Sequence, residues 1–450
     1  MDVPEVDKKI GITAYATKSA GFGGVIRRKS EDFVVEELLT TGERASVAPE
    51  AQFSGLGRYL VCVLVKRNWD TLLAVKAIAR QLGVSVERVA FAGIKDTRAL
   101  TAQHISLYGF RPEEVERVRI RDIRVVPVRY SNEKISELLF GNRFNILISA
   151  IPAQEDEVTR LVNNVQEELS VLGGVPNFFG HQRFGTVRPV THLVGKAIVK
   201  GDLEEAALVF LTYSTVFENP KVKEVRDRLS ETRDFEEALA GFPRRFRYER
   251  LILRHLVHHP NDFAGALRRL PLRLRRLFVQ AYQSFLFNRF LSERIHKSAD
   301  WCSANVGDYV VALDEQGLPL KNGEVATTDT LGGPRNTVVG GKACVTLPLM
   351  GFRQPMSEDL QGEIEALVLE NEGIVRENFR CSVMSEVAAA GGLRTVLSRL
   401  IGFEADKPIV NNENSSTCEL HLRFALHRGS YATIPLREFM KPQNPVEAGF

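Results

Sequence analysis

The sequence predicts an α+β protein whose sheet domain is interrupted by a helical insertion. In the first 174 residues, short apolar segments with β-branched residues alternate with two amphipathic helical segments. From Val175 to about Lys297 the chain becomes helical and rich in arginine, with few strand signals. An alternating apolar pattern returns at residues 419–426. Strand signals on both sides of a helical middle indicate one sheet domain that carries an insertion.

The first strand signals lie between residues 25 and 107. Segment 25–39 mixes β-branched and charged residues and predicts a short strand with polar flanks. Segment 59–65 is almost entirely apolar, as in a strand that is covered on both faces. A helix is predicted from about Asp70, because apolar residues recur at i, i+3, i+4 and i+7 before Gly83. Segments 89–92 and 101–107 are predicted strands, joined by the tight loop 93–100.

A further strand and a long helix follow. Residues 143–150 alternate with the period of a strand, and residues 155–172 begin with three acidic side chains, carry one apolar stripe and end at Gly173. Beyond the helical middle, residues 305–350 are rich in glycine and β-branched residues, and residues 357–377 are acidic. The chain closes with a predicted strand at 419–426, then a loop and a short helix at 428–440.

Composition places the chain among ordinary globular proteins. Its 450 residues are 44% hydrophobic, which is enough for two or three domains, and 59 basic against 56 acidic residues leave a net charge of only +3. The five cysteines are far apart, without zinc-ligand spacing, and no apolar run approaches the roughly 20 residues that span a bilayer. We expect a cytoplasmic protein with reduced thiols and no membrane contact.

A local basic surplus points to a nucleic-acid partner. Residues 244–276 hold ten arginines against two carboxylates, a local charge of +8. Phosphate contact is the favoured interpretation, and the alternative is a solvated helix face above a core. The arginines that we expect to bind RNA in this stretch are Arg268, Arg269, Arg273, Arg275 and Arg276.

Three loops carry the candidate functional residues. Loop 93–96 presents Asp96 at a sheet edge, although an aspartate in a turn commonly bonds only its own backbone. Lys95 and Arg98 beside it favour the carboxylate form and are expected to contact RNA phosphates. Segment 177–185, which contains Arg183, is rich in phenylalanine and glycine and suits an RNA-facing loop or a turn over a core. The third loop, 429–432, contains Tyr431, which is either a platform for base stacking or a packing residue.

The common cofactor motifs are missing from the sequence. It has no P-loop, no dinucleotide-binding glycine pattern, no G-x-S-x-G and no H-E-x-x-H. His255, His258 and His259 lack companions at metal-ligand spacing. We therefore predict no nucleotide, flavin or metal cofactor.

Five motifs in one order resemble the TruD family of tRNA pseudouridine synthases. They are SEDFVVEE at 30–37, FAGIKD at 91–96, GNRF at 141–144, VPNFFGHQRFG at 175–185 and GSYAT at 429–433. The resemblance runs from about Arg27 to Glu438 and covers most of the chain. Each motif alone is modest, but the ordered set is very hard to obtain by chance.

The resemblance implies a fold and an activity. The fold is a pseudouridine synthase catalytic domain, α+β around a mixed sheet with a central cleft, formed by residues 1–174 and 391–450. Residues 175–390 are the TruD-specific insertion domain, which would bind tRNA across the cleft. The implied reaction isomerises a uridine in tRNA, typically uridine 13 in the D arm, without a cofactor. tRNA is the expected partner, and no obligate protein partner is inferred.

The resemblance also implies roles for single residues. The family's nucleophile falls on Asp96, and an aspartate is ordinarily ionised at neutral pH and able to attack the ribose C1′ or the uracil ring. Arg27 takes the place of a basic residue that pairs with it, where bacterial relatives usually have lysine. Phe33, Asn142 and Tyr431 would line the pocket, with phenylalanine usual at the last position in bacteria, and Phe144 would pack on the uracil.

Two alternatives to this enzyme remain at the level of sequence. A non-catalytic RNA-binding protein could use the same fold and the same basic insertion. A small-molecule hydrolase built on Asp96 is disfavoured, because no motif supplies a second catalytic acid or base.

Overall fold

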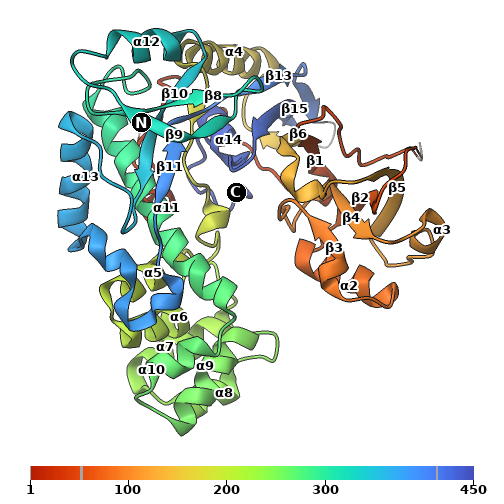
Figure 1. Ribbon diagram of the computed structural model, residues 1–450, viewed down its shortest axis with the longest axis vertical. Helices are drawn as coiled ribbons and strands as arrows, with labels where there is room; N and C mark the ends of the chain where they lie inside the picture. The colour runs from red at the N-terminus through yellow and green to blue at the C-terminus, as the bar shows by residue number, and fades with distance from the viewer. Residues whose placement is uncertain (1, 51–53, 412–413) are drawn as a thin grey trace.

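A computed structural model describes residues 2–50, 54–411 and 414–450, and its centre is a twisted mixed sheet (Figure 1). Within these residues seven strands follow the order β13-β15-β6-β1-β4-β2-β5, and β14 and β3 add to β15 and β4. Strands β1 and β4 are parallel, and the other pairings are antiparallel. The bounds are β1 Phe33–Leu39, β2 Tyr59–Arg67, β3 Val89–Phe91, β4 Leu100–Tyr108, β5 Ile123–Ser131, β6 Leu139–Ile151, β13 Ile401–Ala405, β14 Ile409–Asn411 and β15 Asn414–His427.

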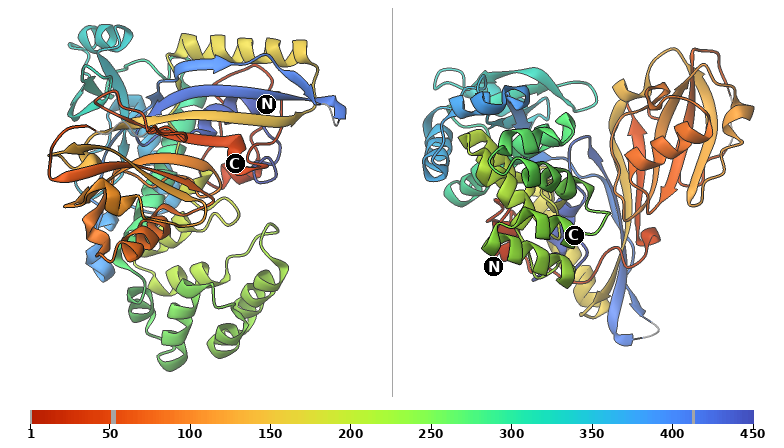
Figure 2. Two further views of the ribbon diagram at one scale, coloured as in Figure 1. Left: turned by 90° about the vertical axis from the view of Figure 1, so that its right-hand side faces the viewer. Right: turned by 90° about the horizontal axis from the view of Figure 1, so that it is seen from below.

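Three helices cover two separate parts of this sheet. Helix α2 (Thr71–Gln81) packs Val75 and Ile78 on β2 and β4, and its N-cap Asp70 accepts a hydrogen bond from the Leu73 amide. Helices α4 (Glu155–Leu172) and α14 (Thr433–Met440) cover β6 and β15 instead. Figure 2 shows α4 running along these long strands. Strand β1 lies between the two covered regions.

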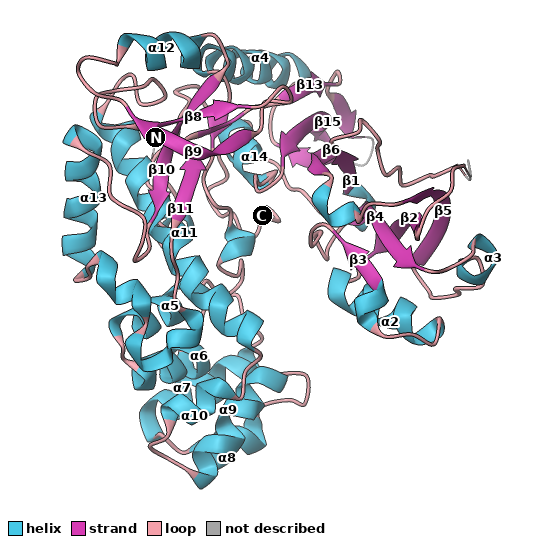
Figure 3. Ribbon diagram, in the orientation of Figure 1, coloured by secondary structure: helices cyan, strands magenta, loops and turns pink. Residues whose placement is uncertain are grey.

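The insertion combines a helical layer with a small antiparallel sheet (Figure 3). Its long helix α11 (Leu272–Lys297) contributes to one hydrophobic core that is shared by helices and sheet. The described strands of this sheet have the order β11-β10-β8-β9, with β8 Tyr309–Leu313, β9 Pro319–Val325, β10 Ala343–Leu349 and β11 Gly392–Thr395. The helices are α5 Thr191–Lys200, α6 Leu203–Thr212, α7 Pro220–Thr232, α8 Phe235–Gly241, α9 Arg247–His258, α10 Phe263–Arg268, α12 Gly332–Val339 and α13 Asp359–Glu372.

The insertion makes close contacts with two segments outside residues 175–390. Strand β11 pairs with β10, so the insertion sheet extends a few residues past 390. The N-terminal segment, with α1 at Glu5–Lys8, packs on the insertion: Asn288 and Ser292 of α11 donate hydrogen bonds to the carbonyls of Ile10 and Gly11. Interdomain contacts therefore come from the first residues of the chain as well as from the insertion.

The short strand predicted within segment 25–39 is β1, which occupies the second half of the segment. Val25 forms only an isolated bridge with Ser149, and Arg27 has a left-handed backbone with φ 59°. Residues Ser30–Asp32 form a short 3-10 turn in which the Asp32 carboxylate accepts a hydrogen bond from the Lys29 amide at 2.7 Å. Strand β1 begins only at Phe33 because this turn uses the backbone groups that a longer strand would pair.

Candidate active site

Asp96 lies in a loop that several buried groups hold in place. The loop connects β3 with β4, beside the first residue of β1, because β1 and β4 are parallel and start at the same sheet edge. The Lys66 ammonium, at the end of β2, donates hydrogen bonds to the carbonyls of Asp96 (2.9 Å) and Trp69 (2.8 Å). Gln103 donates to the Gly93 carbonyl at 3.1 Å. The carboxylate is therefore carried by a fixed backbone.

The Asp96 carboxylate forms an ion pair with Arg27. The guanidinium Nη2 lies 3.0 Å from Asp96 Oδ1, and the side chain of Arg27 is 6% exposed while that of Asp96 is 29% exposed. Arg27 Nη1 donates to the Gly449 carbonyl at 2.9 Å, and the guanidinium stacks 3.8 Å above the Phe33 ring. One face of the carboxylate is thus held by a buried cation, and the rest stays accessible.

Electrostatics around this pair follow from burial. Burial lowers the pKa of Arg27, and the negative charge of Asp96 opposes that change. Burial also lowers the pKa of Lys66 to about 8, again against the attraction of Asp96. Asp96 therefore sits between two cations that are poorly solvated, which strengthens their pull on its charge.

Lys95 supports the loop from inside the protein. Its ammonium lies 2.6 Å from Glu37 Oε2, and the Glu37 Oε1 atom accepts a hydrogen bond from the His104 amide at 3.0 Å. Burial alone would raise the pKa of Glu37, but Lys95 and His104 outweigh burial and the pKa is lowered. Because Lys95 is enclosed, we assign it to loop support in place of the expected RNA contact.

Among the predicted pocket residues of the central strands, Phe33 lies against Arg27 and Phe144 packs on Phe33. Phe33 and Phe144 are buried, with ring centroids 6.3 Å apart in an edge arrangement, and Phe144 packs further on Phe424. The Phe33 ring lies beneath the Arg27 guanidinium, and Phe144 and Phe424 continue this aromatic layer. Asn142 on β6 pairs with Glu37 on β1, and its Oδ1 atom is buried without a hydrogen-bond partner. A buried acceptor of this kind is costly unless a ligand satisfies it.

Comparison with known proteins identifies the family. A family model described as tRNA pseudouridine synthase D (TruD) matches residues 9–439. The chain belongs to the TruD family. A relative from Methanococcoides burtonii that carries the name tRNA pseudouridine synthase D is 39% identical over 444 residues, or 98% of each chain. One from Thermococcus gammatolerans is 37% identical over 429 residues, 95% of this chain and 97% of the relative.

A solved structure agrees with the family assignment. The crystal structure bearing the name tRNA pseudouridine synthase D (TruD) from Methanosarcina mazei matches with a TM-score of 0.83 at 37% identity. The match covers 99% of this chain and 100% of that chain. The resemblance seen in the five motifs and the predicted α+β fold with a mixed sheet are both confirmed.

Two of the TruD motifs meet at Tyr431. The Tyr431 ring lies 6.0 Å from the ring of Phe179, over which the guanidinium groups of Arg183 (5.8 Å) and Arg394 (3.9 Å) are placed. Burial raises the pKa of Tyr431, the two arginines lower it, and Asp96 raises it further. Segment 177–185 and the GSYAT loop therefore contact each other through Phe179 and Tyr431.

The basic stretch of this TruD protein divides into paired and free arginines. Arg268 and Arg275 both bond the Glu386 carboxylate, Arg276 donates to the Glu386 carbonyl, and Arg269 donates to His255. Arg275 is buried, so its expected RNA contact is replaced by this ion pair. Arg273 and Arg98 are exposed. Helices α9 and α10 lie at the lower end of the molecule, apart from α2 and β3 (Figure 1).

Sequence reasoning missed three groups that shape this site: Lys66, Arg394 and Gly449. A lysine at the end of an apolar strand was a visible signal for Lys66, whereas Gly449 and Arg394 stand in segments without a motif. Among residues 2–50, 54–411 and 414–450, no group of three or more His, Cys, Asp or Glu could hold a metal ion. In the same part of the chain, no helix has the length and apolar character of a membrane span.

Proposed function

We propose that this protein converts a uridine of tRNA, uridine 13 of the D arm, into pseudouridine with Asp96 as the nucleophile. The observation that carries the proposal is the accessible Asp96 carboxylate, held by buried Arg27 on a rigid loop. Membership in the TruD family supports the reaction class. A tRNA substrate also supports the expected cytoplasmic location.

The reaction needs a nucleophile and a fixed geometry. The Asp96 carboxylate attacks the ribose C1′ or the uracil ring and forms a covalent link. The N1–C1′ bond breaks, the base turns, a C5–C1′ bond forms and the hydrogen on C5 leaves as a proton. If the carboxylate is bonded to C1′, it leaves as the C5–C1′ bond forms, and if it is bonded to the ring, it leaves after that bond has formed. Either departure restores the enzyme. Arg27 acts as a positioning residue, because its ion pair fixes the direction of one carboxylate oxygen.

The target uridine must leave its base stack before the carboxylate can reach it. We propose that Tyr431 stacks on the flipped base and that the unpaired Asn142 Oδ1 accepts the uracil N3–H. Phe33 and Phe144 form the apolar floor of the pocket. Exposed Arg98, Arg273 and Arg269 supply phosphate contacts, with Arg183 closer to the reacting base.

The test is release of tritium from uracil C5 in unmodified tRNA transcripts, since formation of the carbon glycosidic bond must eject that hydrogen. Wild-type protein is expected to release tritium, and Asp96→Ala is expected to release none while it still binds tRNA. Asp156→Ala, on the exposed first turn of α4, is the matched control and should behave as wild type. Folded protein that binds tRNA and releases no tritium would instead make it a non-catalytic RNA-binding protein.

A further inference from the structure

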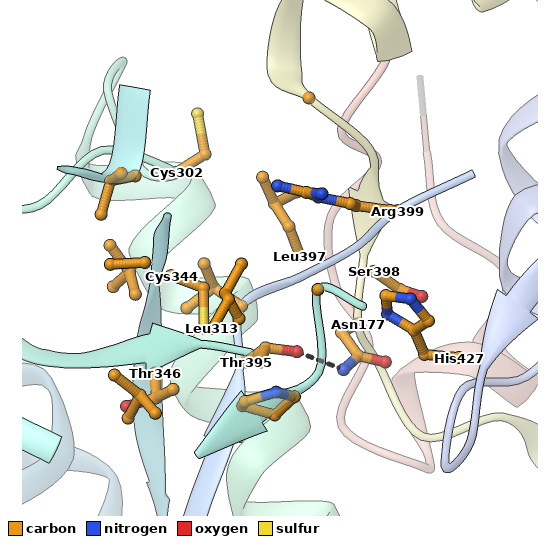
Figure 4. Close-up of a pocket in the computed structure, with 18 of the residues that line it drawn as sticks. Asn177, Cys302, Leu313, Cys344, Thr346, Thr395, Leu397, Ser398, Arg399 and His427 are labelled. Carbon is orange, nitrogen blue, oxygen red and sulfur yellow. Dashed lines mark hydrogen bonds between the residues drawn. The ribbon is translucent and has the colours of Figure 1, made fainter. Parts of the chain in front are cut away.

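A cavity of about 880 Å³ lies between the insertion sheet and the catalytic domain (Figure 4). Its apolar wall comes from β8, β10 and β11, with Val311, Val345 and Leu393. The opposite wall comes from the end of α4, from β12 (Leu397–Ser398) and from the end of β15. The volume falls within the range of ligand pockets, roughly 300–1,000 Å³. The cavity is distinct from the carboxylate site, because Asp96 is not among the residues that line it.

The charge of the cavity favours an anion. Lys321, Arg394, Arg399 and Arg428 line it, and none of its lining residues is an aspartate or glutamate. Arg399 donates to the Gly341 carbonyl at 3.0 Å, and Arg428 donates to the Leu139 carbonyl at 3.2 Å. Both side chains thus use carbonyl partners and keep their positive charge unneutralised, unlike Arg275, which pairs with Glu386. Guanidinium groups in this state suit phosphate.

The mouth of the cavity is apolar. Val171 on α4 and Val339 at the end of α12 line it and are 84% and 86% exposed. Leu320 on β9 adds a third exposed apolar side chain. Exposed apolar side chains beside unneutralised cations indicate a ligand with an apolar part and an anionic part, as in a nucleotide.

The cavity also adjoins the proposed uracil pocket. Ser430 lines it and receives a hydrogen bond from Ser398 at 2.8 Å, and the next residue, Tyr431, is the side chain proposed to stack on the flipped base. Arg394 lines it as well, and its guanidinium lies 3.9 Å from the Phe179 ring beside Tyr431. The GSYAT loop therefore separates two neighbouring compartments.

We propose that this cavity binds a second, unstacked nucleotide of the same tRNA, near the uridine that reacts. The base enters between the apolar side chains of the insertion sheet, and Arg399, Arg428 and Lys321 hold its phosphates. The inference rests on the proposed function and adds a recognition site to it. It also gives the insertion sheet a role, since this sheet forms the apolar wall of the cavity.

Two cysteines make the proposal testable in the unmodified chain. Cys302 and Cys344 line the cavity and are partly exposed, while Cys62, Cys381 and Cys418 are buried. Iodoacetamide should alkylate the first two, and saturating tRNA transcript should slow that alkylation at least tenfold, as followed by mass spectrometry of each cysteine. Undiminished alkylation of both cysteines in protein that binds tRNA would overturn the proposal. Protection by free nucleoside monophosphate but not by tRNA would overturn it as well.

A variant with two substitutions distinguishes tRNA that binds inside the cavity from tRNA that only covers its mouth. Arg399→Ala combined with Arg428→Ala should raise KM for tRNA at least tenfold while kcat changes less than threefold. The matched control is Arg117→Ala, an exposed arginine near α3 (Pro112–Val115) at the far end of the catalytic domain, which should leave both constants unchanged. An unchanged KM in the double variant would refute the site. Tritium release by wild-type protein, measured in the same samples, reports separately whether the proposed function holds.

Discussion

Replacement of Arg27 by alanine tests how the structure positions the Asp96 carboxylate. The variant loses the 3.0 Å ion pair, the hydrogen bond to the Gly449 carbonyl and the stacking on Phe33. Removing one partner of a fully buried ion pair costs about 3–5 kcal/mol. Asp96 is 29% exposed, so water can solvate it once Arg27 is gone. We therefore expect a smaller loss of unfolding free energy, about 2 kcal/mol.

The effect on the reaction should exceed the effect on stability. A misplacement of about 1 Å at a reacting group commonly costs about 100-fold in rate, so single-turnover tritium release should fall by about that factor in Arg27→Ala. Arg27→Lys keeps a charge but cannot span both Asp96 and the Gly449 carbonyl, and a loss of about tenfold is expected. A folded Arg27→Ala protein that reacts at the wild-type rate would refute the positioning role.

Three further predictions concern groups around the site and the basic stretch. Gly449→Ala should lower both Tm and kcat. Gly449 has φ 89°, and an added Cβ would lie 2.2 Å from the Ile26 carbonyl oxygen. Unchanged thermal melting and turnover would contradict this prediction. For Lys66, whose pKa falls from 10.5 to about 8, the unfolded state binds more protons between these values. The unfolding free energy of the wild type should therefore rise by about 2 kcal/mol from pH 7.5 to pH 10 relative to Lys66→Met. Urea titrations at these two pH values that show no relative gain would exclude this prediction. Arg273→Ala should reduce the slope of the logarithm of the tRNA association constant against the logarithm of the salt concentration by about 1. Arg275→Ala should lower Tm and leave this slope unchanged. Filter binding at several salt concentrations distinguishes the two variants.

Local patterns predicted much of the fold. The apolar stripe of α4 and its terminal Gly173 gave the helix bounds correctly, because Gly173 takes the left-handed conformation that ends a helix. The alternation in β6 likewise matched the observed strand, and the glycine-containing loop did place Asp96 between β3 and β4. These features depend on residues that are close together in sequence.

Contacts between distant segments were beyond sequence patterns. The sequence predicted the same RNA contact for Arg275 as for its neighbouring arginines. Its buried ion pair is with Glu386, which lies 111 residues later in the chain. The left-handed backbone of Arg27 and its bond to Gly449 depend on the other end of the chain. Lys95 turns inward because Glu37 on a neighbouring strand receives it. A count of charges along the sequence cannot distinguish a buried, paired side chain from an exposed one, because burial and pairing depend on tertiary partners.

The central claim is that Asp96 turns uridine 13 into pseudouridine. The most direct measurement is primer extension on carbodiimide-treated tRNA transcript after incubation with wild-type protein or Asp96→Asn, with tRNA affinity measured for both. We predict a stop that marks position 13 with the wild type and none with Asp96→Asn, at dissociation constants within threefold of each other. A stop at position 13 produced by Asp96→Asn would contradict the account.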